Sequence, residues 1–256
     1  MKIKVTILGS GTSQGVPLIA CNCLVCKSNN DKDKRLRSSI KIEVENKTFV
    51  IDSGPDFRQQ MLRSNTKQLN ALIFTHEHKD HIAGMDDIRA FNYVNKSAID
   101  VYATDRVEDA LKREYAYIFS DEKYPGIPEV NLKNIENKPF IVQDIEVIPI
   151  QVFHYKLPVL GFRFGDFTYI TDANFINDNE KEKIKGSKVL IVNALRREQH
   201  ISHFTLEEAI ALGQELQVPQ IYFTHISHQL GLHNEVEKEL PPGFHLAYDG
   251  LEIVVD

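Results

Sequence analysis

The sequence of 256 residues contains no tryptophan and only three cysteines. It also lacks any apolar run near the roughly 18 residues that a membrane helix requires. The N-terminal segment 1–5 alternates like a strand and has no signal-peptide pattern, so we expect a cytoplasmic protein. The formal net charge of -6, with histidine counted as neutral, does not favour a broad nucleic-acid-binding face.

Length and composition favour a chain with a substantial buried core, since 42% of the residues are hydrophobic. We find no internal repeat, low-complexity segment or linker, so we expect one domain over residues 1–256. Segment 86–135 interrupts an otherwise strand-rich pattern, and we interpret it as a helical lid over the site. Its aromatic side chains could line a pocket, although most of them fit a core equally well.

The periodicity of the apolar residues predicts mostly strands with a few short helices. Strands are expected at 2–8, 39–45, 48–51, 71–74, 99–103, 145–153, 161–164, 167–170, 188–193, 220–223 and 251–254. Helices are expected at 56–65, 85–95, 105–118 and 232–240. In addition, Asn46-Lys47 is the expected turn of the first hairpin, and Thr205-Leu206-Glu207-Glu208 fits a helix capping box.

The most informative stretch is His76-x-His78-x-Asp80-His81, directly after the apolar strand 71–74. Imidazole and carboxylate side chains together suit zinc, iron or manganese. The alternation lets His76 and His78 point one way while Asp80 and His81 reach another, so one loop could serve two metals. The alternative is a polar surface loop that happens to be rich in histidine.

Four expected strands end in a residue type that binds metals: His76, His154, Asp172 and His225. A lone histidine after a strand is usually a polar turn residue, but sites in α/β sheets gather at strand ends, and the placement repeats here. Together with His78, Asp80 and His81 they make seven possible metal ligands. Seven ligands are too many for one zinc and suit two metals bridged by Asp172. Two close metals can hold a hydroxide between them and lower its pKa.

The cysteines form the pattern Cys21-x-Cys23-x-x-Cys26. An odd, clustered set is a poor disulfide framework, and it indicates a thiolate metal site that lacks a fourth ligand. The alternatives are a redox pair of Cys23 and Cys26 or inert thiols. A redox C-x-x-C usually opens a helix, whereas we expect a loop here.

For two polar residues near these motifs, Asp52 and His200, the sequence leaves two alternative roles open. Asp52, at an expected strand end, could orient a ligand histidine or cap a turn. His200 could approach a substrate or lie on the surface. We expect His233 and His245 to be structural or exposed.

The donors His76, His78, Asp80, His81, His154, Asp172 and His225, in that order, resemble the metallo-β-lactamase superfamily over essentially the whole chain. The resemblance implies an α/β fold, a four-layer αββα sandwich with a dinuclear site at one edge. It implies that His76, His78 and His154 hold one metal, that Asp80, His81 and His225 hold the other, and that Asp172 is shared. Flavodiiron oxidoreductases of the superfamily tend to carry Glu at position 78, so His78 favours hydrolysis.

Two further motifs narrow the resemblance. His203-Phe204-Thr205 is similar to the phosphodiesterase branch, which includes ribonuclease Z, and implies that His203 protonates the leaving oxygen or stabilises the phosphoryl charge. Gly15-Val16-Pro17 followed by the cysteines is similar to the phosphoribosyl cyclic phosphate phosphodiesterase (PhnP) family. That family has a structural zinc on three Cys and one His, which implies Cys21, Cys23, Cys26 and His228 here.

The resulting expectation is a dinuclear metal-dependent phosphodiesterase that opens a small cyclic phosphodiester, with a metal-bridging hydroxide as the attacking group and with His203 and Asp80 as catalytic residues. Its cofactors are two divalent metals, manganese or zinc, and one structural zinc. The alternatives are a ribonuclease Z-like tRNA endonuclease, a thioester or lactone hydrolase, and a non-enzymatic metal-binding scaffold. The expected partner is a small phosphodiester, with neither membrane nor nucleic acid, and the resemblance leaves a homodimer open.

Overall fold

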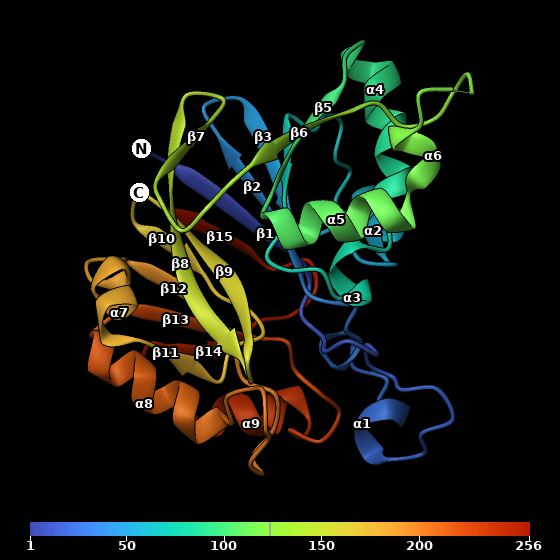
Figure 1. Cartoon of the computed structure of the whole chain (residues 1–256). Coiled ribbons are helices and arrows are strands. Elements are labelled where there is room, and N and C mark those ends of the chain that lie inside the picture. The colour runs from blue at the N-terminus through green and yellow to red at the C-terminus, as the bar shows by residue number, and fades with distance from the viewer. Residues whose placement is uncertain (123) are drawn as a thin grey trace.

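The computed structural model describes residues 1–122 and 124–256 of the chain. Two mixed β-sheets pack face to face, and helices cover the outer face of each sheet (Figure 1). This arrangement confirms the expected αββα sandwich. Among the described residues, no helix combines the length and the apolar character needed to cross a bilayer.

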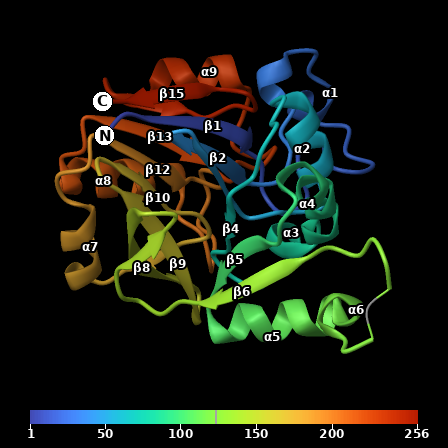
Figure 2. The same ribbon diagram turned by 90° about the horizontal axis from the view of Figure 1, so that it is seen from above.

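The first sheet has seven strands in the order β15-β1-β2-β3-β4-β5-β6. Their bounds are β1 Ile3–Gly9, β2 Ser39–Val44, β3 Lys47–Ile51, β4 Ala71–Ile73, β5 Ile99–Ala103, β6 Val130–Asn134 and β15 Glu252–Val255. Its loops and outer face carry α1 Leu24–Lys27, η1 Asp31–Asp33, α2 Phe57–Arg63, α3 Lys79–Ile82, η2 Met85–Ile88, α4 Arg89–Asn95, α5 Asp105–Glu114 and α6 Ala116–Phe119. Because β1 pairs with β15, with Ile3 opposite Val255, the two termini lie side by side (Figure 2).

The second sheet has the order β11-β8-β9-β10-β12-β13-β14, and β7 pairs with β8. Its strands are β7 Phe140–Val142, β8 Ile145–His154, β9 Leu157–Phe164, β10 Phe167–Tyr169, β11 Phe175–Ile176, β12 Val189–Asn193, β13 Gln220–Thr224 and β14 Phe244–Leu246. Its helices are α7 Asp178–Ile184, α8 Leu206–Leu216 and α9 His233–Glu239. The expected capping box is present: Glu208 N–H donates to Thr205 Oγ1 at 3.1 Å, and Thr205 N–H donates to Glu208 Oε2 at 2.8 Å.

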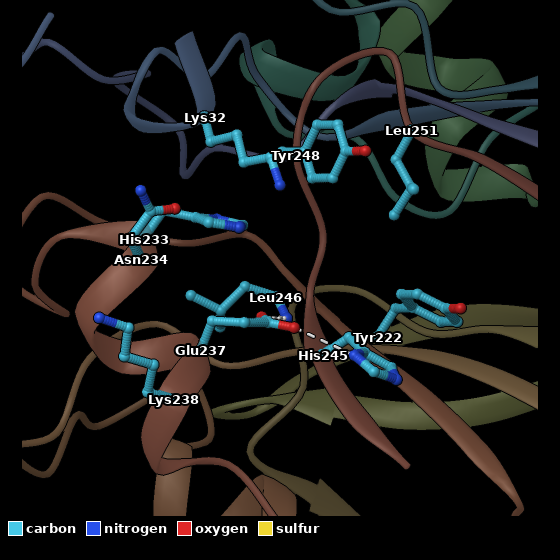
Figure 3. A pocket seen from close by; sticks show the side chains of 10 residues that line it. All are labelled: Lys32, Tyr222, His233, Asn234, Glu237, Lys238, His245, Leu246, Tyr248 and Leu251. Carbon is cyan, nitrogen blue, oxygen red and sulfur yellow. Dashed lines mark hydrogen bonds and ion pairs between the residues drawn. The ribbon is translucent and has the colours of Figure 1, made fainter. Parts of the chain in front are cut away.

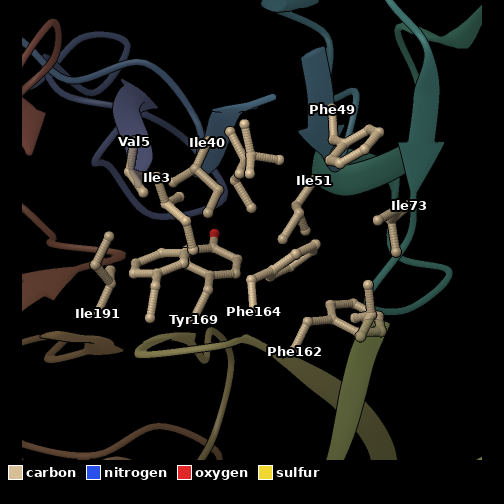
Figure 4. Close-up of a cluster of buried hydrophobic side chains, with 14 of the residues drawn as sticks. Ile3, Val5, Ile40, Phe49, Ile51, Ile73, Phe162, Phe164, Tyr169 and Ile191 are labelled. Atoms are coloured by element: carbon tan, nitrogen blue, oxygen red, sulfur yellow. The ribbon is translucent and has the colours of Figure 1, made fainter. Parts of the chain in front are cut away.

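The largest apolar cluster lies between the two sheets, where their inner faces interdigitate (Figure 4). Phe49 of β3 stacks on Phe164 of β9 with the ring centroids 6.4 Å apart. Both rings are fully buried. Burial of each such ring stabilises the fold by about 1.5–3 kcal/mol. The strands that carry the candidate site are therefore held on a rigid base.

Topology brings the candidate donors to one edge of the sandwich. Strands β3, β4, β5 and β6 run parallel to one another, as do β10, β12, β13 and β14. The carboxyl ends of parallel strands meet at one edge of a sheet, which is where α/β proteins place their sites. His76 follows β4, Asp172 follows β10 and His225 follows β13, while His154 is the last residue of β8.

Segment 86–135 contains the strand expected at 99–103, which is β5, and a further strand, β6, that was not expected. Both extend the first sheet beyond β4, because Val101 and Ala103 pack under the outer helices while Tyr102 packs between the sheets. Lys123, which falls in this segment, lies outside the described residues. Whether the segment covers the site remains a prediction.

Two expectations about the bounds of elements are wrong. The helix expected at 105–118 is broken at Tyr115, whose backbone leaves helical geometry (φ -120°, ψ 41°) and whose hydroxyl donates to the carbonyl of Ile82 at 2.8 Å. The hairpin turn falls at Glu45 and Asn46, one residue earlier than expected, because both residues adopt positive φ angles of 49° and 64°. Such paired left-handed residues match the twist of a two-residue hairpin.

Candidate metal-dependent active site

The buried carboxylate of Asp52, which follows β3, accepts hydrogen bonds from three groups beyond the end of β4. Its Oδ2 accepts from His81 Nδ1 at 2.7 Å and from Thr75 Oγ1 at 2.8 Å, and its Oδ1 accepts from Thr75 N–H at 2.9 Å. Since His81 Nδ1 carries the proton, its Nε2 presents a lone pair. Asp52 thus both orients His81 and closes the turn, so the two roles left open by the sequence coexist.

The lone pair of His81 faces two carboxylates. His81 Nε2 lies 3.2 Å from Asp80 Oδ2 and 3.3 Å from Asp172 Oδ2. Asp172 Oδ2 also lies 3.2 Å from His225 Nδ1. In the described part of the chain, His81 Nε2 is buried and has no hydrogen-bond partner. A lone pair that points at two carboxylates is repulsive unless a cation lies between them, so these donors fit a metal ion.

The protonation energetics of this cluster lead to the same conclusion. Burial works against charge, but the imidazoles of His81 and His225 outweigh it and hold the pKa of Asp172 well below its usual range. For His81, burial is outweighed by the charges of Asp80 and Asp172, and its pKa is raised well above the usual value. The carboxylates therefore hold a positive charge at His81, and a metal cation can take the place of that proton.

A second set of imidazoles lies beside the first. His76 Nε2 is 3.0 Å from His78 Nδ1, and the ring centroids of His78 and His154 are 5.2 Å apart. Two nitrogens on one tetrahedral zinc lie about 3.3–3.4 Å apart when each bond is about 2.0–2.1 Å long, so the separation of these two nitrogens is close to that of ligands on a shared metal. His76 Nδ1 contacts Thr75 Oγ1 at 3.0 Å, and His154 Nδ1 donates to the carbonyl of Ser202 at 2.9 Å. Each contact leaves the Nε2 lone pair free for a ligand role.

Burial keeps three of the site histidines neutral, which is the form that binds metals. Burial, and then the charge of His81, lowers the pKa of His76 well below the usual value. Burial also lowers the pKa of His154 and lowers that of His225 to about 4. A proton therefore does not compete strongly with a metal for these three ligands near neutral pH.

His203 lies at the rim of the donor cluster. Its Nε2 is 3.2 Å from Asp172 Oδ1, and its ring stacks on that of His225 with centroids 4.8 Å apart. His200 is also drawn in, since its Nδ1 lies 3.1 Å from His203 Nδ1. Spatially, His203 also forms a possible ligand group with His154 and Asp172. Of the two roles left open for His200, the position beside His203 favours a place near substrate.

Three residues of the site have a left-handed backbone, which side chains with a Cβ rarely adopt. Asp52, Asp172 and His225 have φ angles of 64°, 55° and 56°. Asp52 and His225 directly follow β3 and β13, and Asp172 lies three residues after the end of β10, so the chain turns sharply at the ends of these strands. Strained backbone of this kind is typical of functional sites.

The structure brings the three cysteines to His228, as the resemblance implies. His228 Nδ1 lies 3.5 Å from Cys21 Sγ and 3.3 Å from Cys23 Sγ, and Cys26 belongs to the same group. Sulfur and nitrogen on a tetrahedral zinc lie about 3.5 Å apart, for bonds of about 2.3 Å and 2.0 Å. The geometry and the donor set therefore fit zinc.

One premise about the cysteines is wrong, because they do not lie in a plain loop. Cys23 caps the helical turn α1, and Cys26 N–H donates to Cys23 Sγ at 3.4 Å. This bond, followed by that from His228, lowers the pKa of Cys23 to about 6. A thiol that opens a helix is also compatible with redox chemistry. The convergence of Cys21 and His228 on the same point favours a metal over a redox pair.

Sequence reasoning missed the small residues that hold the ligands. Thr12 Oγ1 lies 3.2 Å from His225 Nε2, and Ser38 Oγ lies 3.2 Å from His225 Nδ1. Thr12 and Ser38 lie in the connection between β1 and β2 of the first sheet, whereas His225 follows β13 of the second. Isolated Ser and Thr residues carry no pattern in a sequence, although Thr12 does follow a conspicuous Gly-Ser-Gly turn.

The expectation for the two remaining histidines holds: His233 is buried and His245 pairs with Glu237 at 3.0 Å.

The fold and its edge cluster define the class as a metal-dependent hydrolase of metallo-β-lactamase fold. The chain belongs to the beta-lactamase superfamily, since residues 47–226 match the family model described as "Beta-lactamase superfamily domain". The crystal structure of a new diphosphatase from the PhnP family is 37% identical, with a TM-score of 0.94, and covers 100% of this chain and 98% of its own. Zinc-bound PqqB from Methylobacterium extorquens shares the fold at 19% identity and a TM-score of 0.78, over 98% of this chain and 99% of its own.

Curated relatives are similar to the chain over part of their own length. An octanoyltransferase from Porphyromonas gingivalis is 40% identical over 257 residues, which cover 99% of this chain and 52% of the relative. A ribonuclease Z from Acaryochloris marina is 28% identical over 169 residues, covering 64% of this chain and 48% of the relative. The chain thus spans about half the length of these curated relatives.

Proposed function

We propose that the chain is a dinuclear metal-dependent phosphodiesterase that opens a small cyclic phosphodiester such as a phosphoribosyl cyclic phosphate. The observation that carries the proposal is the position of His203, 3.2 Å from Asp172 at the rim of the donor cluster. An acid at that place suits a reaction in which an alkoxide leaves. The similarity to a PhnP-family diphosphatase over the full chain supports a phosphorus centre.

The metal ligands of this proposal come from both sheets. One divalent metal would be held by His76, His78 and His154, the other by Asp80, His81 and His225, and both by Asp172. Manganese and zinc both suit these imidazoles and carboxylates. When bound, such metals lower the pKa of water and neutralise charge on the phosphate and the departing oxygen.

Three residues of the chain would then handle proton transfer and the positioning of the reacting groups. His203 Nε2–H, now donated toward Asp172, would be passed to the leaving oxygen as its bond to phosphorus breaks. Asp80 stays ionised because the charge of the neighbouring His81 outweighs burial and lowers its pKa well below the usual range. Its free oxygen would accept a hydrogen bond from the attacking water. His200 would hold the His203 ring through the contact at Nδ1.

A separate structural zinc is proposed on Cys21, Cys23, Cys26 and His228. The supporting observation is that one turn of helix places two of the thiols, while His228 reaches them from the loop that also carries His225. A closed site of this type contributes to folding rather than to catalysis. It would fix the loop from which His225 reaches the active site.

We also propose that residues 1–256 form a single domain, because donors from both sheets complete one site. A small anionic substrate is the proposed partner. Net charge disfavours a large RNA.

A second candidate reaction is hydrolysis of a diphosphate bond, since the relative that is 37% identical over the full chain is described as a diphosphatase. The same donors could serve it, because both reactions displace an oxygen from phosphorus. The octanoyltransferase relative makes an acyl thioester a further candidate substrate, but this chain matches only 52% of that protein.

The test is turnover by protein loaded with manganese or zinc, beside a chelator-treated control and a His154→Ala variant. The substrates are a ribose cyclic phosphate, a nucleoside 2′,3′-cyclic phosphate, a dinucleoside diphosphate, a precursor tRNA and an octanoyl thioester. Metal-dependent opening of the cyclic phosphates, lost in His154→Ala, supports the proposal. Preferential cleavage of the diphosphate, the tRNA or the thioester would replace it with the corresponding alternative.

A further inference from the structure

A cavity of about 520 Å³ lies away from the metal donors, between α9, the edge strand β14 and the loop that carries η1 (Figure 3). Its volume falls within the roughly 300–1,000 Å³ of small-molecule sites. None of the residues that line it belongs to either proposed metal site. Its chemistry is therefore independent of the reaction proposed above.

The wall of the cavity contains a buried donor without a partner. His233 is 2% exposed, and its Nδ1 lies 3.2 Å from the NH2 group of Arg35. Because a guanidinium can only donate, Nδ1 accepts and the ring proton lies on Nε2. In the described part of the chain, no hydrogen bond reaches Nε2, which leaves an N–H available to a ligand in the cavity.

Arg35 fixes this tautomer firmly. Its guanidinium is buried, and it also donates to Ser10 Oγ at 2.8 Å and to the carbonyl of Ala247 at 2.6 Å. Burial, and then the charge of Arg35, lowers the pKa of His233 to about 4. His233 is therefore a neutral donor near neutral pH, with a fixed positive charge behind it.

The remaining lining combines aromatic rings with free cations. Lys32 Nζ lies over the Tyr248 ring, 4.4 Å from its centroid, and the rings of Tyr222 and His245 are 5.2 Å apart at 31°. Figure 3 shows Lys32 and Tyr248 across the cavity from His245. No ion pair is formed by Lys32 or Lys238 with any residue that the structure describes.

Glu237 is the acidic residue of the lining, and it is already satisfied. Its Oε1 accepts from His245 Nδ1 at 3.0 Å, and its Oε2 accepts from Leu246 N–H at 2.6 Å. An anion entering the cavity would therefore meet the charge of Lys32 and an imidazole N–H, while the carboxylate oxygens of Glu237 are turned toward His245 and the Leu246 N–H.

From this lining we infer that the cavity binds a nucleoside monophosphate. The phosphate would lie between Lys32 and the Nε2–H of His233, which together supply charge and a fixed donor. The base would lie against Tyr248 and Tyr222, since aromatic side chains stack on every base. A nucleoside alone would contact only the aromatic side chains of the lining, and inorganic phosphate alone would contact only its donors.

Isothermal titration calorimetry of the metal-loaded protein with 5′-AMP tests this site, with adenosine and inorganic phosphate as separate probes. Lys32→Ala and Tyr248→Ala should each weaken AMP binding about tenfold, or about 1.4 kcal/mol. Lys133→Ala, an exposed lysine on β6, is the matched control and should bind as the wild type does. Adenosine and phosphate should each bind more weakly than AMP. Thermal unfolding checks that every variant is folded.

The metal centre could also bind a phosphate, so His154→Ala is titrated in parallel. AMP binding that persists in His154→Ala and weakens in Lys32→Ala and Tyr248→Ala supports the second site. AMP binding that disappears in His154→Ala and is unchanged in Lys32→Ala overturns it, as does the absence of AMP binding. If phosphate alone binds as tightly as AMP, the nucleotide assignment is wrong.

Discussion

Asp52→Asn should weaken metal binding although Asp52 is not a proposed ligand. In the native protein, Asp52 Oδ2 accepts from both His81 Nδ1 and Thr75 Oγ1. An asparagine can keep the acceptor for Thr75 N–H, but it then presents an NH2 group to His81. The imidazole would have to accept at Nδ1 and carry its proton on Nε2, which faces Asp80 and Asp172.

The expected magnitude follows from these contacts. A hydrogen bond to a charged group contributes about 1.5–3 kcal/mol. Removal of a group that orients a metal ligand typically costs 10–100-fold in metal affinity or activity. The variant should therefore bind manganese or zinc at the active site about 10–100 times more weakly. Part of its turnover should return at high metal concentration.

The assay is a competition titration with a chromophoric chelator, with the metal content measured by mass spectrometry. Asp144→Asn is the matched control, because the Asp144 side chain is 95% exposed and lies away from the site. The structural zinc should be retained in both variants. An Asp52→Asn protein with native metal affinity, within about threefold, would refute the orienting role.

Three further predictions follow from the same structure. Cys23→Ser should lose one equivalent of zinc and much thermal stability, as should His228→Ala; retention of all metal by both would remove the proposed zinc site. His203→Ala should keep its metal content while its turnover falls about 10²–10⁴-fold; unchanged turnover would exclude a proton-transfer role. The folded pKa of His233, about 4, lies below the unfolded value of about 6.5, so its contribution to stability is present above pH 6.5 and is lost as the pH falls toward 4. His233→Gln should show a shallower decline of the thermal midpoint over that range in the presence of chelator, and an equal slope would contradict the assignment.

The donors of the active site were predictable because each follows a strand that is visible in the sequence. His76, Asp172 and His225 come after apolar runs, and β-strand ends converge whenever the strands are parallel. By contrast, the partner of His233 is Arg35, 198 positions away, and no periodicity links the two. Contacts of this kind depend on the finished packing of the two sheets.

The elements that sequence reasoning missed are short or polar. Strand β6, with the sequence Val-Asn-Leu-Lys-Asn, lies at the edge of the first sheet, and its residues are exposed or half-buried. Edge strands need only one paired side, so they do not require the apolar pattern of central strands. Helix α7 buries only Ile184 and is otherwise polar, so its sequence is typical of a solvated loop as well.

The positive φ angles of Asp52, Asp172 and His225 have a consequence for directed evolution. Glycine adopts this conformation without the steric penalty that a Cβ brings. Asp52 accepts three buried hydrogen bonds that glycine would lose, so a library selected for heat resistance alone should accumulate glycine at Asp172 and His225 rather than at Asp52, at the expense of the metal centre. Screens that select for thermostability would need a second selection for bound metal to avoid drifting toward an inert fold.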